Sequence, residues 1–174
     1  MSADSGRAVG RIRPLVHADC PAVRVLLRAT ENFNEAELRL ADELMDSFLD
    51  RPGQEDYFAF VAEAPGPAGP AVVGFLVVGP TAATVGTWDL YWIAVAPSHQ
   101  GRGIGQALDT CAEVFVRARW GYLILAETSG RPRYARSRAF YRKQGYEAVA
   151  RIADYYGPAD DLIIFAKRWS NPIA

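Results

Sequence analysis

The chain has 174 residues, of which 50% are apolar and 22% charged, a composition typical of one globular domain with a sizeable core. Its formal net charge is −1, and no apolar run approaches the roughly 20 residues that cross a bilayer, which argues against a globally basic nucleic-acid binder and a membrane protein. Cys20 and Cys111 are the only cysteines, too few for a disulfide framework or a thiolate metal site. We therefore expect no metal and a reducing, cytoplasmic setting.

Apolar periodicity and turn residues predict strands and helices in a mixed order. Segment 1–10 is polar, lacks the apolar core of a signal peptide and is predicted to be disordered, and one domain is predicted over 11–174. The order βααβββαβαββ combines hairpins with a helical crossover and predicts an α+β fold. Strands are expected at 11–16, 57–64, 71–78, 87–96, 122–126, 146–153 and 162–167, and helices after Asp19-Pro21, around Leu40 and Leu44, from Ile104 to Phe115, and at 134–144.

Large rings interrupt the alternation of the predicted strand 87–96. Trp88, Tyr91 and Trp92 cannot all lie on one face of a regular strand, because Tyr91 and Trp92 are adjacent. Some of these rings are expected in the core, and one could line a ligand pocket.

Charge is distributed unevenly along the chain. Residues 31–56 have a net charge of −7, whereas residues 117–143 have a net charge of +7. Two interpretations remain open at this stage. A cationic ligand and an anionic ligand bind near the two stretches, or both stretches are solvated helix faces.

A glycine-rich turn between a predicted strand and a predicted helix is the most informative motif. In Gln100-Gly101-Arg102-Gly103-Ile104-Gly105, glycines at alternate positions leave the backbone N–H groups open to close approach, and the following helix adds its positive end. The motif indicates a phosphate cradle, and its alternative is a turn that merely starts a helix. A Rossmann turn is excluded because Gln106 or Leu108 stands where the third small residue belongs, and a Walker loop because no Lys-Ser/Thr follows.

Two motifs together carry a family resemblance. The first is Gln-x-x-Gly-x-Gly after a strand, at Gln100–Gly105, and the second is Phe140-Tyr141-Arg142-Lys143-Gln144-Gly145-Tyr146 at the end of a helix. They resemble the pyrophosphate-binding signature and the Phe-Tyr-x-x-x-Gly-Phe/Tyr hallmark of the GNAT superfamily of acyl-CoA-dependent N-acetyltransferases. The order of elements agrees from about residue 11 to 167. The resemblance implies a single GNAT-like domain, with a mixed, mostly antiparallel central sheet flanked by helices, and acetyl-CoA (coenzyme A) as the cofactor.

The resemblance also implies which residues bind coenzyme A. A strand backbone would pair with the pantetheine arm, an N–H near Val95 would polarise the thioester carbonyl, and the turn would bind the pyrophosphate, with charge-assisted contacts from Arg102 and Arg138. Many members carry Asn where this chain has Tyr134, so Tyr134 and Ser137 resemble a variant of that cofactor contact. The implied cofactor-binding set is Ile93, Ala94, Val95, Gln100, Gly101, Arg102, Gly103, Ile104, Gly105, Tyr134, Ser137 and Arg138.

Two side chains are candidates for proton transfer. An amine nucleophile must lose a proton, and a departing thiolate must gain one. Tyr141 matches the family tyrosine and, with a phenol pKa of about 10, suits the acid, whereas its alternative role is core packing. Glu127 ends a predicted strand and is the candidate base, directly or through a water, with a salt bridge to an arginine of the following loop as the alternative.

The resemblance therefore implies transfer of an acetyl group from acetyl-CoA to a primary amine by direct attack in a ternary complex. The acidic stretch 31–56, Asp154-Tyr155-Tyr156 and Asp160-Asp161 are expected near the acceptor. Such an acidic wall favours a cationic amine on a small molecule, a peptide or protein N-terminus, or a lysine. A non-catalytic acyl-CoA-binding sensor or regulatory protein of the same fold is the alternative. No nucleic-acid or membrane partner is expected, and a homodimer remains open.

Overall fold

The computed structural model describes residues 10–31, 33–66 and 69–170. The elements follow the predicted order, with short 3-10 turns before α1, α3 and α4. The segment 1–10 predicted to be disordered lies outside the described residues except for Gly10, whose N–H donates to the Glu63 carbonyl oxygen. The elements are β1 (Arg11–Pro14), α1 (Cys20–Ala29), α2 (Glu35–Leu49), β2 (Phe58–Gly66), β3 (Gly69–Pro80), β4 (Thr87–Val95), α3 (Ile104–Arg117), β5 (Leu123–Ser129), α4 (Ala135–Lys143), β6 (Glu147–Gly157) and β7 (Asp160–Arg168).

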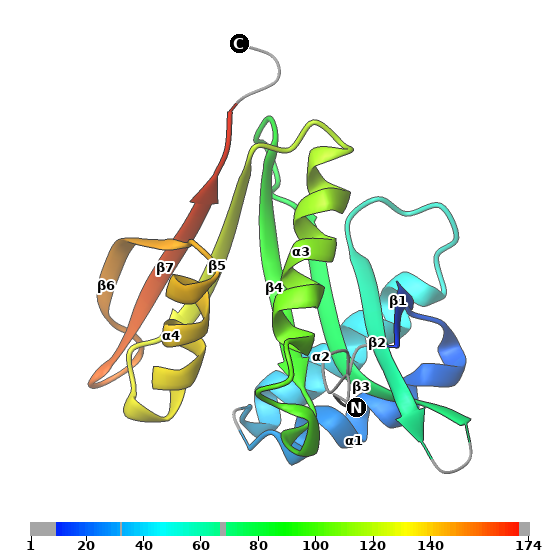
Figure 1. Cartoon of the computed structure of the whole chain (residues 1–174). Coiled ribbons are helices and arrows are strands. Elements are labelled where there is room, and N and C mark those ends of the chain that lie inside the picture. The colour runs from blue at the N-terminus through cyan, green and yellow to red at the C-terminus, as the bar shows by residue number, and fades with distance from the viewer. Residues whose placement is uncertain (1–9, 32, 67–68, 171–174) are drawn as a thin grey trace, which may run out of the picture.

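The strands of the described chain form one seven-stranded sheet in the order β1-β2-β3-β4-β5-β7-β6 (Figure 1). Adjacent strands are antiparallel except β4 and β5, which α3 connects as a crossover, the connection that a parallel pair requires. The prediction of an α+β fold with a mixed, mostly antiparallel sheet is confirmed.

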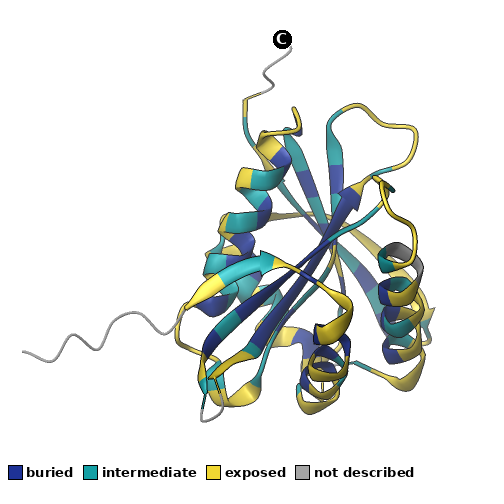
Figure 2. Cartoon of the chain, turned by 90° about the vertical axis from the view of Figure 1, so that its right-hand side faces the viewer, coloured by how far each residue is buried: buried dark blue, intermediate teal, exposed yellow. Residues whose placement is uncertain are grey.

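Helices cover both faces of the sheet and make two apolar cores. On one face, α3 contributes Ile104, Leu108, Ala112 and Val116, and α4 contributes Tyr141. On the other face, α1 and α2 pack against β2, β3 and β4. Figure 2 shows that the buried residues concentrate in the central strands and on the inward sides of the helices. None of the helices in the described ranges is long and apolar enough to cross a membrane.

The buried face of helix α2 differs from the one expected from its sequence. Leu40 was expected on its apolar face, but this side chain is 54% exposed. The buried stripe is instead Leu38, Ala41 and Met45, which are separated by three and four residues and so lie on one side of an α-helix. Leu40 is left facing solvent and the cavity described below.

A β-bulge at Tyr91 explains the crowding of large rings in β4. Val78 of β3 pairs with Leu90 and Val77 pairs with Trp92, so Tyr91 is an extra residue without a partner on β3. Leu90 packs into the α3/α4 core, whereas Trp92, two residues further on, packs into the α1/α2 core. The bulge therefore reverses the faces of the strand at this point.

Strands β4 and β5 diverge after the bulge. Their pairing runs from Thr87 with Leu123 to Leu90 with Ala126 and does not continue along the rest of β4. Figure 1 shows the two strands side by side at one end and apart at the other. This divergence leaves backbone groups of β4 without a strand partner on that side, and it positions the candidate site.

Candidate active site

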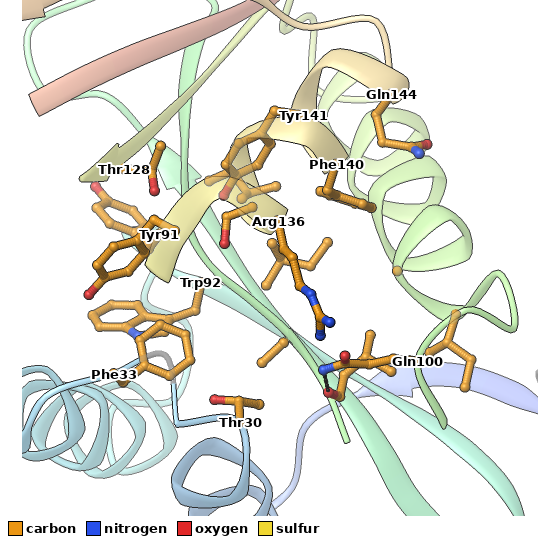
Figure 3. Close-up of a pocket in the computed structure, with 18 of the residues that line it drawn as sticks. Thr30, Phe33, Tyr91, Trp92, Gln100, Thr128, Arg136, Phe140, Tyr141 and Gln144 are labelled. Carbon is orange, nitrogen blue, oxygen red and sulfur yellow. Dashed lines mark hydrogen bonds between the residues drawn. The ribbon is translucent and has the colours of Figure 1, made fainter. Parts of the chain in front are cut away.

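A cavity of about 1030 Å³ lies where β4 and β5 diverge (Figure 3). Its walls come from the end of α1 and the start of α2, from β4 and β5, from the glycine-rich turn, from α4 and from Tyr156 of β6. Figure 3 shows Phe33, Tyr91 and Trp92 grouped on one side, Phe140 and Gln144 on the other, and Arg136 extending between them. The cavity thus brings together segments from about residue 29 to 156 of the chain.

Opposite charges line opposite faces of this cavity. Because Trp88 and Leu90 of β4 and Ile124 and Ala126 of β5 belong to the α3/α4 core, the alternate residues Asp89 and Glu127 lie on the α1/α2 face. Glu31 and Glu37 reach the cavity from the α1/α2 side as well, whereas the basic lining residues, His99, Arg136 and Lys143, come from the turn and α4. One face of the site suits a cation and the other an anion.

The glycine-rich turn has the backbone shape of an anion cradle. Gly101 and Gly103 have φ angles of 75° and 80°, a left-handed conformation that favours glycine, and a Cβ atom at either position would meet no atom within 4 Å. Gly103 also precedes the first turn of α3, whose free N–H groups carry the positive end of the helix dipole. Gly105 has a different role, because its Cβ would lie 3.1 Å from the Phe140 ring.

The backbone of β4 next to the turn faces the gap. The Ala96 N–H donates to the Val73 carbonyl oxygen at 2.9 Å, so by antiparallel alternation the backbone groups of Ala94 point to β3 and those of Ile93 and Val95 point away from it. The Gln100 side chain donates to the Val95 carbonyl oxygen at 3.1 Å. The Val95 and Ile93 N–H groups are left for a partner within the cavity.

Tyr141 is buried but places its hydroxyl at the cavity. Only 6% of the residue is exposed, and its ring packs against Phe140, Tyr146 and Phe165 with centroid distances of 5.4 to 5.7 Å. The hydroxyl points into the cavity in Figure 3 and makes no hydrogen bond to any described residue. Burial, with smaller contributions from Asp109 and Tyr156, raises the pKa of Tyr141 and keeps it protonated.

A buried polar cluster lies behind Tyr141. Asp109 of α3 accepts from the Tyr146 hydroxyl at 2.9 Å and from the Lys167 ammonium at 3.2 Å, and Lys167 also contacts Glu113. Burial raises the pKa of Asp109, while Lys167 and Tyr146 favour its carboxylate form. The cluster ties α3 to β7 and provides the negative charge that contributes to the raised pKa of Tyr141.

Glu127 lies on β5, two residues before the end of the strand, with its side chain on the acidic face. Partial desolvation is the main cause that raises the pKa of Glu127, and the Asp89 carboxylate raises it further. The alternative salt bridge to the next loop does not form within the described residues, because Arg131 pairs with Asp160 at 3.0 Å. A carboxylate with a raised pKa and no ion pair is a suitable proton acceptor.

The structure brings most of the predicted site residues together. Ten of the twelve residues expected to bind the cofactor line the cavity with Tyr141 and Glu127, whereas Arg102 and Arg138 do not. Arg102 is exposed on the turn. The Arg138 guanidinium donates to the Ser129 and Arg131 carbonyl oxygens at 2.6 and 2.9 Å, so it holds the loop before α4. The Tyr134 hydroxyl lies 3.4 Å from Glu37, on the acidic face.

Sequence reasoning did not select some of the lining residues. Arg136, Phe140 and Lys143 of α4 line the cavity and are spaced by four and three residues, so they share one face of the helix. That spacing was available in the sequence, but the start of α4 was needed to interpret it. Asp154-Tyr155-Tyr156 and Asp160-Asp161 were expected near the acceptor site: Tyr156 lines the cavity, whereas Asp160 and Asp161 bond within the fold.

Several members of the two charged stretches have structural partners outside the cavity. Asp42 and Asp46 of α2 both pair with Arg24 of α1, and the Arg119 guanidinium lies 3.7 Å from the centre of the Phe115 ring. These residues do not serve a ligand in the cavity. The ligand interpretation applies to the few that line the cavity.

Comparisons with known proteins agree with this geometry. Residues 55–148 match the family model of the acetyltransferase (GNAT) domain. The chain is similar to a Desulfovibrio desulfuricans protein assigned to the GNAT acetyltransferases, with 37% identity, coverage of 91% and 98% of the two chains, and a TM-score of 0.84. No curated protein matches the sequence.

Two more distant structures share the fold. Ribosomal-protein-alanine N-acetyltransferase of Brucella melitensis is 25% identical, with coverage of 92% and 100% and a TM-score of 0.70. The Salmonella typhimurium protein yncA, solved with acetyl-CoA, is 21% identical, with coverage of 97% and 98% and a TM-score of 0.69.

Proposed function

Because the chain belongs to the GNAT family of acetyltransferases, we propose that it transfers an acetyl group from acetyl-CoA to a primary amine by direct attack in a ternary complex. The observation that carries the proposal is the convergence of three features in one cavity. These are the open glycine turn, the unpartnered Tyr141 hydroxyl and the Glu127 carboxylate.

The residues present fit coenzyme A. The turn at Gly101 and Gly103 leaves space and N–H groups for a pyrophosphate, and the N–H groups of Ile93 and Val95 are free to pair with an extended amide-bearing arm. Arg136 and Lys143 lie on the same side and favour an anionic ligand. When bound, acetyl-CoA supplies the acetyl group as a thioester, and the Val95 N–H is the donor available to its carbonyl oxygen.

Glu127 and Tyr141 account for the proton balance of the reaction. Amide formation joins the acceptor nitrogen to the acetyl carbon and breaks the carbon–sulfur bond, so the nitrogen loses a proton and the thiolate gains one. Glu127 takes the first proton, directly or through a water, because its raised pKa strengthens it as a base. Tyr141 donates the second, since its hydroxyl is protonated and has no protein partner.

Direct attack is supported by what lines the cavity. The described lining residues include no cysteine: Cys20 is buried at the start of α1, and Cys111 lies on α3 outside the lining. A thiol that could carry the acetyl group is therefore not available. Because opposite charges line opposite faces of the cavity, acetyl-CoA and the acceptor amine can be bound at the same time, one on each face. We also propose a cytoplasmic setting, which suits two free thiols.

The test combines binding and turnover. The protein is titrated with acetyl-CoA by calorimetry, and thiol release is followed with a panel of amines and peptides. Saturable binding with amine-dependent thiol release is the expected result. Binding without release on any amine would favour the alternative of an acyl-CoA sensor, and the lack of binding would refute the assignment of the Gln100–Gly105 turn.

A further inference from the structure

The acidic face of the cavity forms a separate chamber for the acceptor. We use the term acceptor chamber for the part of the cavity lined from the α1/α2 side and by the outward residues of β4 and β5. Four carboxylates line it, from Glu31, Glu37, Asp89 and Glu127, and no basic side chain does so among the described residues. Arg133 lies outside the lining, stacks on the Tyr134 ring at 4.9 Å and donates to the Tyr134 hydroxyl at 3.2 Å.

Two of these carboxylates come from different elements and line the cavity together with Tyr156, namely Glu127 of β5 and Glu37 of α2. Burial raises the pKa of Tyr156 to about 12, and the charges of Glu127 and Glu37 contribute to the rise. Glu37 is held in place, since it accepts from the Asn34 N–H at 2.7 Å in the capping box of α2 and lies 3.4 Å from the Tyr134 hydroxyl. The chamber therefore has a second, fixed anionic position in addition to the candidate base.

The surface between these positions is aromatic. Phe33, Tyr91, Trp92, Tyr134 and Tyr156 line it, together with the exposed Leu40. Such walls pack well against methylene groups and hold cations over ring faces. Thr30, which also lines the cavity, already donates to the Leu27 carbonyl oxygen.

The hydroxyl of the buried Tyr141 ring also points toward this chamber. Only 6% of Tyr141 is exposed, and its hydroxyl makes no hydrogen bond to any described residue. The hydroxyl points to the part of the cavity where the acidic and basic faces meet. The hydroxyl oxygen is open to the cavity and not sealed in the core, since every fully buried side-chain polar atom of the described residues has a hydrogen-bond partner. It is therefore free to bond a ligand there. It marks the point at which an acceptor in the chamber would react.

We propose that the acceptor is an aliphatic diamine, acetylated on the amine next to Glu127 while its second, protonated amine is held by Glu37 and the surrounding rings. This inference rests on the proposed function. A free amino acid would bring its carboxylate against the acidic lining, which disfavours it. Transfer converts one amine to a neutral amide, so the product has one cation fewer than the substrate and binds less tightly.

The test compares three probes of equal chain length. Cadaverine has two amines, pentylamine has one, and δ-aminovalerate replaces the second amine with a carboxylate. Thiol release with acetyl-CoA gives kcat/KM, and calorimetry on the complex with coenzyme A gives Kd. We expect cadaverine to exceed pentylamine by about tenfold or more in both measurements, as one charge-assisted contact suggests, and δ-aminovalerate to be the poorest.

Glu37→Gln isolates the second anionic position. Glutamine can still close the capping box, so the fold is expected to survive, and the melting temperature checks this. The advantage of cadaverine over pentylamine should fall about tenfold. Glu43→Gln is the matched control, because Glu43 is exposed on the same helix and does not line the cavity.

The outcomes separate this inference from the proposed function. Equal values for cadaverine and pentylamine, or an advantage that persists in Glu37→Gln, would overturn the diamine assignment while leaving acetyl transfer intact. Lack of thiol release with every amine would overturn the proposed function. In that case the calorimetric preference for cadaverine still decides whether the chamber binds a diamine.

Discussion

The Tyr141→Phe substitution tests the proposed acid most directly. It removes one oxygen from a ring that keeps its contacts with Phe140, Tyr146 and Phe165. Because that hydroxyl has no protein partner, the free energy of unfolding should change by less than about 0.5 kcal/mol. Loss of a general acid, in contrast, should lower kcat about a hundredfold, equivalent to about 3 kcal/mol in the barrier.

Three measurements on the same sample separate chemistry from folding. Thiol release under saturating substrates gives kcat, calorimetry gives the Kd of coenzyme A, and urea unfolding gives the stability. Only kcat should change. Tyr122→Phe serves as the control, because Tyr122 is half-buried and does not line the cavity. A kcat within twofold of the unsubstituted protein would refute the role of Tyr141 as the acid.

The raised pKa of Tyr141 also predicts how kcat depends on pH in the alkaline range. A raised pKa means that Tyr141 remains protonated at pH values where an ordinary tyrosine would already lose its proton. No loss of kcat from ionisation of Tyr141 should therefore occur below about pH 10, the ordinary tyrosine value. A decline of kcat at pH 8 to 9 that disappears in Tyr141→Phe would contradict the assigned protonation state.

Three further predictions concern the rest of the site. Gly103→Ala should weaken coenzyme A binding at least about tenfold in calorimetry, because a left-handed residue with a Cβ is strained by about 1 kcal/mol and the new methyl group enters the cradle. Glu127→Gln should lower kcat/KM yet raise the melting temperature at pH 7. The raised pKa of Glu127 means that its charge opposes folding above that pKa, so the difference in melting temperature should vanish in acid, where the glutamate is protonated in both states. Asp109→Asn should reduce the free energy of unfolding by about 1–3 kcal/mol in urea, because the charged partner of Lys167 in the buried cluster is lost; an unchanged midpoint would show that Glu113 alone satisfies Lys167.

The elements and the cofactor side of the site were predictable because their signals are local. The order of strands and helices follows from short-range periodicity, and the turn at Gly101 and Gly103 is a contiguous motif whose backbone geometry matches its glycines. Tyr141 belongs to the contiguous motif Phe140–Tyr146 at the end of α4. In each case, residues close together in the sequence determine the element or the site residue that was predicted.

The acceptor side was less predictable because it depends on contacts between distant segments. Glu37 meets Tyr134 across 97 positions of the chain, and nothing in either segment indicates this pairing. Arg138 resembles a phosphate ligand in sequence, but the carbonyl oxygens of the loop before α4 compete for its guanidinium and hold it. Of the hairpin residues expected near the acceptor, Tyr156 lines the cavity, whereas the Asp161 carboxylate accepts from Arg151 and from the Asp154 N–H.

The bulge at Tyr91 makes the site depend on backbone register as well as on side-chain identity. If Tyr91 instead entered the ladder opposite Val77, Trp92 to Val95 would each shift by one position along β3 and exchange one face of the sheet for the other. Deletion of Tyr91, in contrast, would leave Trp92 opposite Val77 and keep these faces, because Leu90 already pairs with Val78. A change that straightens β4 without shortening it should therefore disturb the register of the site more than the loss of Tyr91 itself.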